Sequence, residues 1–444
     1  MKRVDPVPEE GPLPLQTIRR SDIPLTAPPT PPLPSPRRYH GLDAIRAVMM
    51  ALGLLLHVAL CYGEGPWIYK DPATTGLAGV ITISVHVFRM PIFFVMAGFF
   101  AAMIHERRGA RVFAIQRFDR IVIPLGIGWF VLFPLLSWSI IFAWTHASIP
   151  PDSVGGGWNA IVAAFRKMTW STNWADAGPM HLWFLYDLVW FYAAAIVLSP
   201  IAMRLGPITR GCRAALDGLT LGRARWLATP LVLAVLTLAM LPMRDPGLDT
   251  QDGWAPVPHL LLVYGLWFWL GWIAWGRRAV VERLHAGWWW RVSLGLALLN
   301  GALVAIIAAY AGRASGDPMG PTGVVMTQFL VVASTWYLLL GLVGMAERLL
   351  RRENAAIRWF VDASYFLYLA HLPFAILVPA MLRNWDAPAI AKMTASLVIM
   401  TVGLSIAYQL LVRHTVIGVV LNGRRGRDHR PRLTAEVTPP TTGS

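Results

Sequence analysis

The chain has few cysteines and few charged residues. Only 2 of its 444 residues are cysteine and 14% are charged, whereas 56% are hydrophobic. Cys61 and Cys212 show no metal-ligand spacing, and the topology predicted below places them near opposite membrane faces. We therefore expect neither a metal site nor a disulfide. A chain with so little charge and so much apolar sequence is predicted to be an integral membrane protein, with the lipid bilayer as its surroundings.

Acidic residues are scarcer than basic ones. The chain has 39 lysines and arginines against 24 acidic residues, which gives a net charge of +15. The basic residues gather in short segments between apolar runs, as the positive-inside rule predicts for cytoplasmic loops. No soluble domain is available to present a basic face, so we expect no binding to nucleic acid.

Apolar runs near the length of a bilayer crossing predict an all-α, polytopic helical bundle of about ten transmembrane helices. Four arginine-rich loops alternate with loops poor in basic residues, which places both termini in the cytoplasm. The predicted helices are 42–62, 77–103, 120–144, 181–203, 226–243, 259–276, 288–311, 322–346, 362–382 and 389–413.

The two ends of the chain lack apolar runs. Residues 1–38 are rich in proline and 414–444 are polar and basic, so both are predicted to be disordered tails flanking a transmembrane domain at 39–413. The loop at about 145–180 is predicted to lie outside. It carries tryptophans at 158, 170 and 174, which fit an interfacial aromatic belt or, less simply, a sugar-stacking surface.

One predicted helix carries two polar residues where lipid-facing helices have none. Arg46 and His57 lie eleven residues apart in GLDAIRAVMMALGLLLHV (41–58). At about 100° per residue they share one face, roughly 16 Å apart along the axis. Asp43 is expected to pair with Arg46 three residues on. Arg46 could simply snorkel and His57 could bond a neighbouring helix, but ionisable groups inside a membrane are functional by default.

A second polar pair lies in ISVHVFRMPIFFVMAGFF (83–100). His86 and Arg89 are three residues apart and share a helical face. They form either a structural pair or part of a site, because an arginine at that depth needs a partner or water. Pro91 and Gly98 are expected to allow a kink and close helix packing.

Arg117 and Arg120 in QRFDRIVIP (116–124) also share a face, at the predicted cytoplasmic boundary. They are either ordinary positive-inside anchors or, with Arg46, a site for a phosphate-rich ligand. The sequence has no G-x-S-x-G, H-E-x-x-H or Walker motif. Any chemistry must therefore depend on histidine as base and on arginine for charge stabilisation.

Five motifs in order carry a resemblance: GLDAIR with His57, FRMPIFFVMAGFF, RFDRIVIP, HLWFLYDL (181–188) and SYFLYLAHLP (364–373). Over about 39–413 the chain resembles the acyltransferase-3 family of membrane O-acyltransferases, and within it the glucan biosynthesis protein C branch, which is associated with succinyl transfer. The family pattern includes a basic residue ten intervening residues before a histidine, met by Arg46 and His57, and an R-x-x-R, met by Arg117 and Arg120.

The resemblance implies transfer of an acyl group from cytoplasmic acyl-CoA to a hydroxyl of an extracytoplasmic glucan, in the inner (plasma) membrane. Acyl-CoA is then a co-substrate, with no permanently bound cofactor, and other glucan-biosynthesis proteins are candidate partners. We expect the arginines at 46, 117 and 120 to hold the donor's phosphates. His57 would act as base or transient acyl carrier. Arg89 would stabilise the oxyanion, with His86 orienting Arg89 or facing the acceptor. His181, Trp183 and His371 are assigned to the acceptor, although His371 could equally be a packing residue.

Two other readings of the sequence remain open. A membrane transporter of acylated sugars or organic anions would also need buried histidine and arginine, although no internal repeat is evident. A structural scaffold in a glucan-export complex is the third possibility, but it would not need polar groups at membrane depth. Consumption of a thioester would distinguish the enzyme from the carrier.

Overall fold

The computed structural model describes residues 40–150, 155–167, 177–204, 210–211, 214, 217, 225–245, 247–277, 281, 283–350 and 355–422. The proline-rich tail predicted at 1–38 lies outside these ranges, as do Trp170, Trp174, Cys212 and the end of the predicted basic tail. Within them the regular structure is helical and no strand occurs.

The helices follow the apolar runs of the sequence, because a backbone in lipid must satisfy its own hydrogen bonds. In chain order they are α1 (His40–Ala59), α2 (Gly76–Arg117), η1 (Phe118–Val122), α3 (Ile123–Ser148), α4 (Gly156–Lys167), η2 (Met180–Leu182), α5 (Trp183–Arg204), α7 (Arg225–Met240), α8 (Pro258–Gly276), α10 (Trp288–Ser315), α11 (Pro321–Leu349), α12 (Ala355–Met381), α13 (Ala389–Ala407), η3 (Tyr408–Val412) and α14 (Val416–Asn422).

Eight helices among the described residues are long and apolar enough to cross a membrane. One of them is the helical run Gly76–Ser148, which covers two of the ten predicted segments, and α7 is too short to be counted. The chain is therefore a multi-pass helical bundle, while the number of crossings and the side of each terminus stay predictions.

The prediction of a loop at 104–120 is wrong. α2 continues to Arg117 and passes through η1 directly into α3. The segment after Ile104 is rich in good helix formers such as alanine, arginine and glutamate, so it continues the helix beyond the apolar run. The break is a single residue, Gly109, whose φ of 77° and ψ of 165° only glycine adopts readily.

Two further helices lie where none was predicted. α4 is a twelve-residue helix inside the predicted outer loop, and its Trp158 is exposed. α14 lies inside the range predicted to be a disordered tail, so the chain is helical up to Asn422. Both carry enough apolar residues to form a helix but too few for a membrane span.

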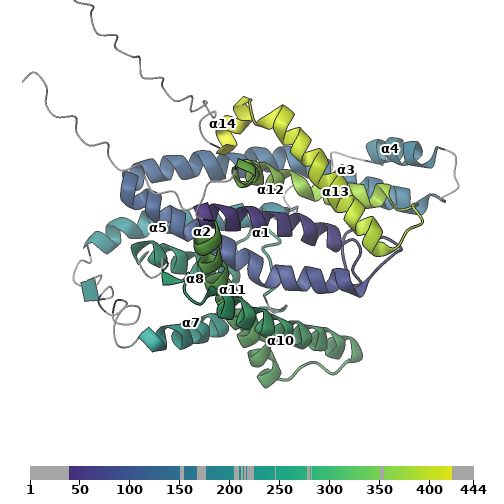
Figure 1. Ribbon diagram of the computed structural model, residues 1–444. Coiled ribbons are helices and arrows are strands. Elements are labelled where there is room, and N and C mark those ends of the chain that lie inside the picture. Colours follow the sequence, from purple (N-terminus) through teal and green to yellow (C-terminus); the bar gives the residue numbers. More distant parts are fainter. Residues whose placement is uncertain are drawn as a thin grey trace, which may run out of the picture. The chain divides into compact units, whose positions relative to one another are not determined.

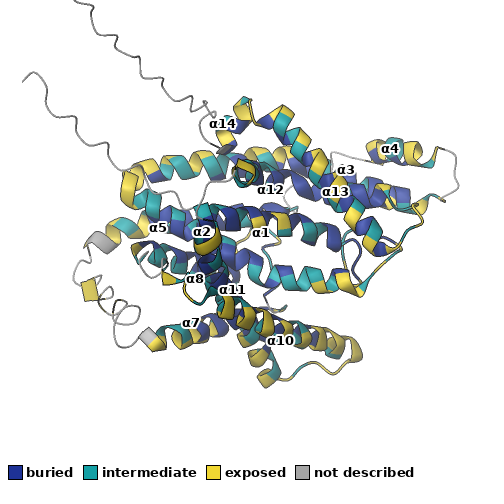
Figure 2. Ribbon diagram, in the orientation of Figure 1, coloured by how far each residue is buried: buried dark blue, intermediate teal, exposed yellow. Residues whose placement is uncertain are grey.

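α1 lies in the interior of the bundle, as its mostly buried colouring in Figure 2 shows. It contacts α2, α11, α12 and α13, and these helices surround it in Figure 1. A Cβ on Gly41 would lie 2.9 Å from the backbone of Ala346 in α11. This close approach explains why a glycine begins the helix there.

α2 and α8 cross even more closely. A Cβ on Gly98 would lie 1.9 Å from the carbonyl oxygen of Phe268, and one on Gly271 would lie 1.8 Å from that of Val95. The predicted close packing at Gly98 is confirmed. These paired glycines fix α2, the helix that carries His86 and Arg89, against its neighbour.

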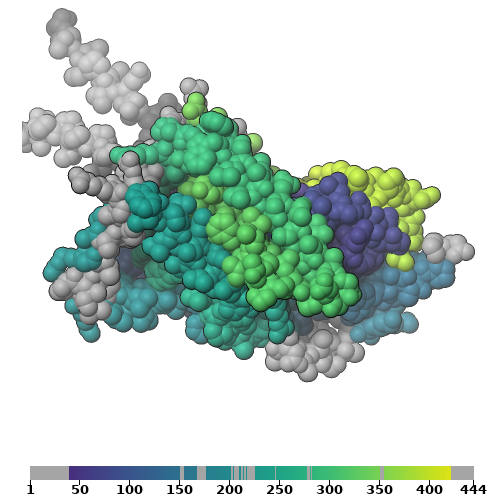
Figure 3. All heavy atoms as spheres, turned by 90° about the horizontal axis from the view of Figure 1, so that it is seen from below, coloured from purple at the N-terminus to yellow at the C-terminus, as the bar shows by residue number. Residues whose placement is uncertain are grey.

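The outer face of the bundle is apolar. The atoms of α10 and α11 cover the middle of the face shown in Figure 3. On α10, Val304 is 68% exposed and Ile307 is 46% exposed. Such residues on a helix surface fit contact with lipid chains rather than water.

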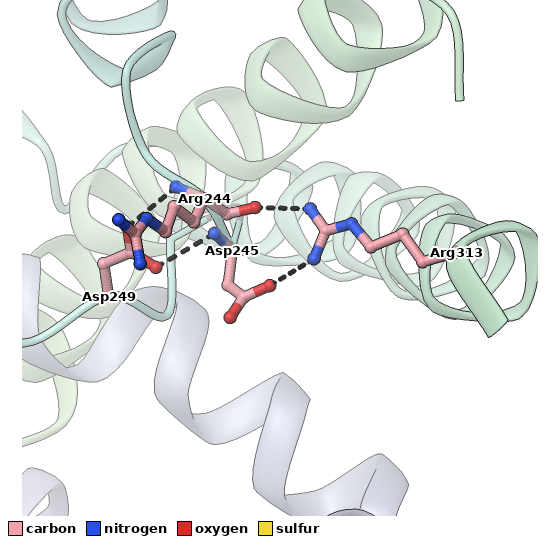
Figure 4. Close-up of polar contacts among 4 residues, drawn as sticks. All are labelled: Arg244, Asp245, Asp249 and Arg313. Carbon is pink, nitrogen blue, oxygen red and sulfur yellow. Dashed lines mark hydrogen bonds and ion pairs between the residues drawn. The ribbon is translucent and has the colours of Figure 1, made fainter. Parts of the chain in front are cut away.

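The aspartates of the segment between α7 and α8 fix its fold. Asp249 accepts hydrogen bonds from the backbone N–H groups of Arg244 and Asp245, at 2.8 and 2.9 Å. Arg313, at the end of α10, donates to the Asp245 carboxylate at 2.6 Å and to the carbonyl of Arg244 (Figure 4). Arg313 thus connects this segment to α10, while Asp249 holds the segment's own backbone.

Candidate active site

The predicted polar stripe on α1 is present. Arg46 and His57 lie on the helix as expected, and Arg46 forms the predicted ion pair with Asp43, at 3.5 Å. Gly53 lies on the same stripe, four residues before His57. Its missing side chain leaves a space on the face that leads from the arginine to the histidine.

Arg89 of α2 fills that space. A Cβ on Gly53 would lie only 2.0 Å from Nη1 of Arg89, so the guanidinium lies against the α1 backbone one turn before His57. Arg89 is only 7% exposed and forms no ion pair or hydrogen bond with any described residue. A buried cation without a partner is unfavourable unless a ligand supplies charge or hydrogen-bond acceptors.

Three histidines from different parts of the chain meet beside this arginine. The ring centroid of His371 lies 4.8 Å from that of His57 and 5.4 Å from that of His181. His57, His86 and Arg89 lie within electrostatic range of one another. The structure therefore brings five predicted site residues together, from α1, α2, η2 and α12, and His57 faces into the bundle.

Backbone carbonyls fix the protonated nitrogen of two of these rings. Nδ1 of His371 lies 2.7 Å from the carbonyl oxygen of Tyr368, and Nε2 of His181 lies 2.8 Å from that of Leu369. Because a carbonyl oxygen only accepts, each of these nitrogens carries the proton. The opposite nitrogens, Nε2 of His371 and Nδ1 of His181, are buried and have no partner. Each offers a lone pair to a ligand.

A second polar stripe runs along α12. Tyr365, Tyr368 and His371 are spaced three residues apart and so share one face. The hydroxyl of Tyr365 donates to the carbonyl of Arg120 at 2.6 Å, and that of Tyr368 donates to the carbonyl of His181 at 2.8 Å. α12 packs on α1, and its polar stripe connects the histidine cluster to the region of Arg120.

The arginines at the other end of the stripes form a cluster of their own. Arg120 lies within electrostatic range of Arg46, Arg108 and Arg117. The guanidinium of Arg117 lies 5.0 Å from the ring centroid of Tyr192, a face-on cation–π contact. Such a concentration of positive charge, with Arg46 and Arg117 half-buried, is suited to a polyanion. Arg108 was not among the predicted site residues.

The segment between α1 and α2, residues 60–75, covers the histidine cluster from the end opposite the arginines. Its Trp67 ring lies 6.1 Å from that of His57. Asp71 forms a buried ion pair with Lys392 of α13 at 2.8 Å, and Lys392 also donates to the carbonyl of Arg383. Burial raises the pKa of the Cys61 thiol to about 12, so this thiol stays protonated near neutral pH. We refer to residues 60–75 as the cover segment.

Trp183 and His86 lie in different surroundings from each other. Trp183 is buried in an aromatic cluster, with its ring centroid 5.1 Å from that of Tyr264 and 6.1 Å from that of Phe94. His86 is half-buried and its Nε2 has no partner. In the described part of the chain, His86 lies near Arg89 but forms no hydrogen bond with it.

Two negative observations concern cavities and metals. A small hollow lies between α2, α7, α8 and α11, lined by residues such as Pro91, Tyr264 and Trp267, and none of its lining residues belongs to the histidine cluster. The described residues contain no group of three histidine, cysteine or acidic side chains that could hold a metal ion.

Several residues near the site escaped the sequence analysis. Tyr365 and Tyr368 could have been found from the three-residue spacing that ends at His371. Asp187 lies in the motif HLWFLYDL, and an acidic residue inside an apolar span is itself a signal. Lys392 and Asp71 are 321 positions apart, and no local pattern relates them.

The chain is similar to proteins of a known family. The acyltransferase-3 model, described as an acyltransferase domain, matches residues 39–410. The "Glucans biosynthesis protein C" of Salmonella typhimurium is 25% identical over 408 residues, covering 90% of this chain and 99% of its own length. That of Salmonella typhi is 25% identical over 398 residues, covering 88% and 96%. No solved structure is significantly similar to the chain.

Proposed function

The chain belongs to the acyltransferase-3 family, and from this we propose that it transfers an acyl group from cytoplasmic acyl-CoA to a hydroxyl of an extracytoplasmic glucan. The named relatives are glucan biosynthesis proteins, which favours a glucan acceptor and a cell inner membrane location. The acyl group is succinyl or acetyl in this proposal.

One observation carries the proposal. A buried, unpartnered guanidinium and three histidine rings lie at one end of two facing polar stripes, and the arginine cluster lies at the other end. Acyl-CoA has a matching arrangement, because its phosphates and its thioester are at opposite ends of the long pantetheine arm. Arg46, Arg117 and Arg120 would hold the phosphates, with the thioester beside Arg89 and His57.

The chemistry then needs only the groups in this cluster. Neutral His57 takes the proton of the acceptor hydroxyl as the oxygen attacks the thioester carbonyl. The guanidinium of Arg89 stabilises the oxyanion that forms, with His86 close by. The C–S bond breaks, the ester is formed, and the CoA thiolate receives the proton from the imidazolium. In a two-step alternative, the acyl group is transferred first to His57 with release of CoA and then from this acyl-histidine to the acceptor hydroxyl.

The acceptor would reach the cluster from the end opposite the arginines. His181 and His371 each have a buried nitrogen without a hydrogen-bond partner among the described residues, and we propose that both orient a sugar hydroxyl. Trp183 is buried among aromatic rings, so we propose that it supports His181 rather than contacting the glycan openly.

Purified protein in vesicles tests the proposal. With acyl-CoA on the arginine side and glucan on the other, wild type should release CoA thiol and acylate the glucan in equal amounts. The R117A/R120A variant should raise the KM for acyl-CoA about tenfold to a hundredfold, with less change in the KM for glucan. Movement of acylated sugar or organic anion without thiol release would show a transporter instead.

A further inference from the structure

Asp187 of α5 is a buried acid with no partner. It is 0% exposed, and neither carboxylate oxygen has a hydrogen-bond partner in the described structure. An acid buried without a cation or donor is strongly unfavourable, and such groups are usually satisfied by water, a proton or a ligand. The mechanism above does not use Asp187.

Its neighbours cannot satisfy it. Asp187 lies within electrostatic range of Tyr264 and Tyr368. Each tyrosine has one O–H group to donate, and both are already used: Tyr264 donates to the carbonyl of Asp249 and Tyr368 to that of His181, each at 2.8 Å. Neither hydroxyl is therefore left to donate to the carboxylate.

Asp187 lies between the two ends of the site. It is preceded by His181 of η2, whose ring contacts that of His371, and followed on α5 by Tyr192, whose ring contacts Arg117. At about 1.5 Å per residue, Asp187 is roughly 8 Å from Tyr192 along the axis. A ligand that extends from the arginine cluster to the histidine cluster would pass Tyr368 and so come within reach of it.

We propose that Asp187 binds the pantetheine arm of acyl-CoA by accepting hydrogen bonds from its amide N–H groups. This inference rests on the proposed function. Between the phosphates and the thioester, the arm carries two amides and one hydroxyl, so it offers the donors that the protein lacks at this position. A carboxylate is also the strongest acceptor for an amide N–H.

Fragments of the donor test this assignment. S-acetylpantetheine and adenosine 3′,5′-bisphosphate are measured as inhibitors competitive with acyl-CoA, in wild type and in the D187A, D187N and R117A variants. D187A should weaken inhibition by S-acetylpantetheine about tenfold to a hundredfold, and D187N less, because its amide oxygen still accepts. Inhibition by the bisphosphate should be unchanged in both, and R117A should show the opposite pattern.

Stability provides a second readout that does not depend on activity. Because removing an unpaired buried acid relieves an unfavourable group, ligand-free D187N should melt at or above the wild-type temperature. Its melting temperature should then rise less with S-acetylpantetheine than that of wild type. Equal inhibition and equal thermal shifts in wild type and both Asp187 variants, or a raised KM for glucan alone, would overturn the assignment.

The two possible failures are distinguishable. If wild type binds neither acyl-CoA nor the fragments and releases no thiol, the proposed function itself is wrong, and this inference with it. If wild type transfers acyl groups normally and the Asp187 variants bind S-acetylpantetheine as wild type does, only the role of Asp187 is wrong.

Discussion

Two regions of the bundle contain buried charged residues, which are paired in one region and unpaired in the other. In the cover segment, Asp71 is neutralised by Lys392 of α13, which also donates to a backbone carbonyl. In the interior, Arg89 and Asp187 have neither an opposite charge nor a hydrogen bond among the described residues. Because an isolated buried charge is destabilising, substitutions in the two regions should change stability and activity differently.

The difference separates a structural role from a functional one. A paired charge holds two segments together, and breaking the pair should lower stability while the chemistry remains possible. An unpaired charge does not stabilise the fold, so removing it should lower activity and leave stability unchanged or improved. Substitutions in each region test whether paired charges are structural and unpaired charges are functional.

Replacing His57 should abolish transfer without weakening the fold. A positioned base contributes about a hundredfold to ten-thousandfold to a rate, so the kcat of H57A should fall by that factor. Glucan acylation at equal membrane protein levels measures the loss. The melting temperature should match wild type, since Nδ1 of His57 has no partner to lose. Full activity of H57A would remove it from the chemistry.

Breaking the Asp71–Lys392 pair should show the reverse pattern. K392M leaves a buried carboxylate unpaired, which is expected to lower the free energy of unfolding by about 3–5 kcal/mol. The D71N/K392M variant removes both charges and should recover much of that loss. Thermal unfolding in detergent measures both.

The buried thiol of Cys61 reports on the same segment. It lies in the cover segment and donates to the carbonyl of Ala375 at 3.3 Å. In a C212S background, a maleimide should label Cys61 slowly in wild type, because burial raises its pKa to about 12, and faster in K392M. Equal labelling rates would show that the ion pair does not hold the cover segment closed.

Adding a methyl group at Gly53 should displace the Arg89 side chain and reduce the rate of transfer without removing any charge. In G53A the new Cβ would occupy the position of the guanidinium, 2.0 Å from Nη1, so the side chain must shift. A shift of about 1 Å at a reacting centre can lower kcat a hundredfold. G403A is the matched control, because a Cβ there meets no atom within 4 Å. Equal rates in the two variants would contradict the placement of Arg89.

An exposed ion pair gives the smallest expected effect. Arg313 and Asp245 are 46% and 38% exposed, so solvent screens their interaction. R313A should therefore lower the free energy of unfolding by less than about 1 kcal/mol and leave kcat unchanged. Measuring the free energy of unfolding of R313A and K392M in parallel compares the exposed ion pair with the buried one. A loss as large as that of K392M would show that exposure does not distinguish the two pairs.

The sequence predicted what depends on local spacing. Apolar runs indicated the helices, the three-residue interval predicted the pairing of Asp43 with Arg46, and Gly98 was correctly expected at a close helix contact. The eleven-residue interval from Arg46 to His57 placed both on one stripe of α1. These features follow from the geometry of a single helix.

What the sequence could not predict depends on tertiary contacts. The meeting of His57, His181 and His371 needs three distant segments to pack together, and the Asp71–Lys392 pair joins segments 321 positions apart. The loop expected at 104–120 is helical because helix propensity, rather than hydropathy, governs that stretch. Asp187 carries a local signal, as an acid inside an apolar span, but its lack of a partner depends on how the other helices pack around it.

Photolabelling tests the central claim most directly: one acyl-CoA molecule connects the arginine cluster to the histidine cluster. An analogue with a diazirine in the acyl group and an azide on the adenine is crosslinked to wild type, and the labelled peptides are sequenced. The acyl end should label α1 or α12 near His57 and His371, and the adenine end should label the end of α2 or η1 near Arg117 and Arg120. Labelling of both ends at the arginine cluster, or of the acyl end on a lipid-facing helix such as α10, would contradict the account.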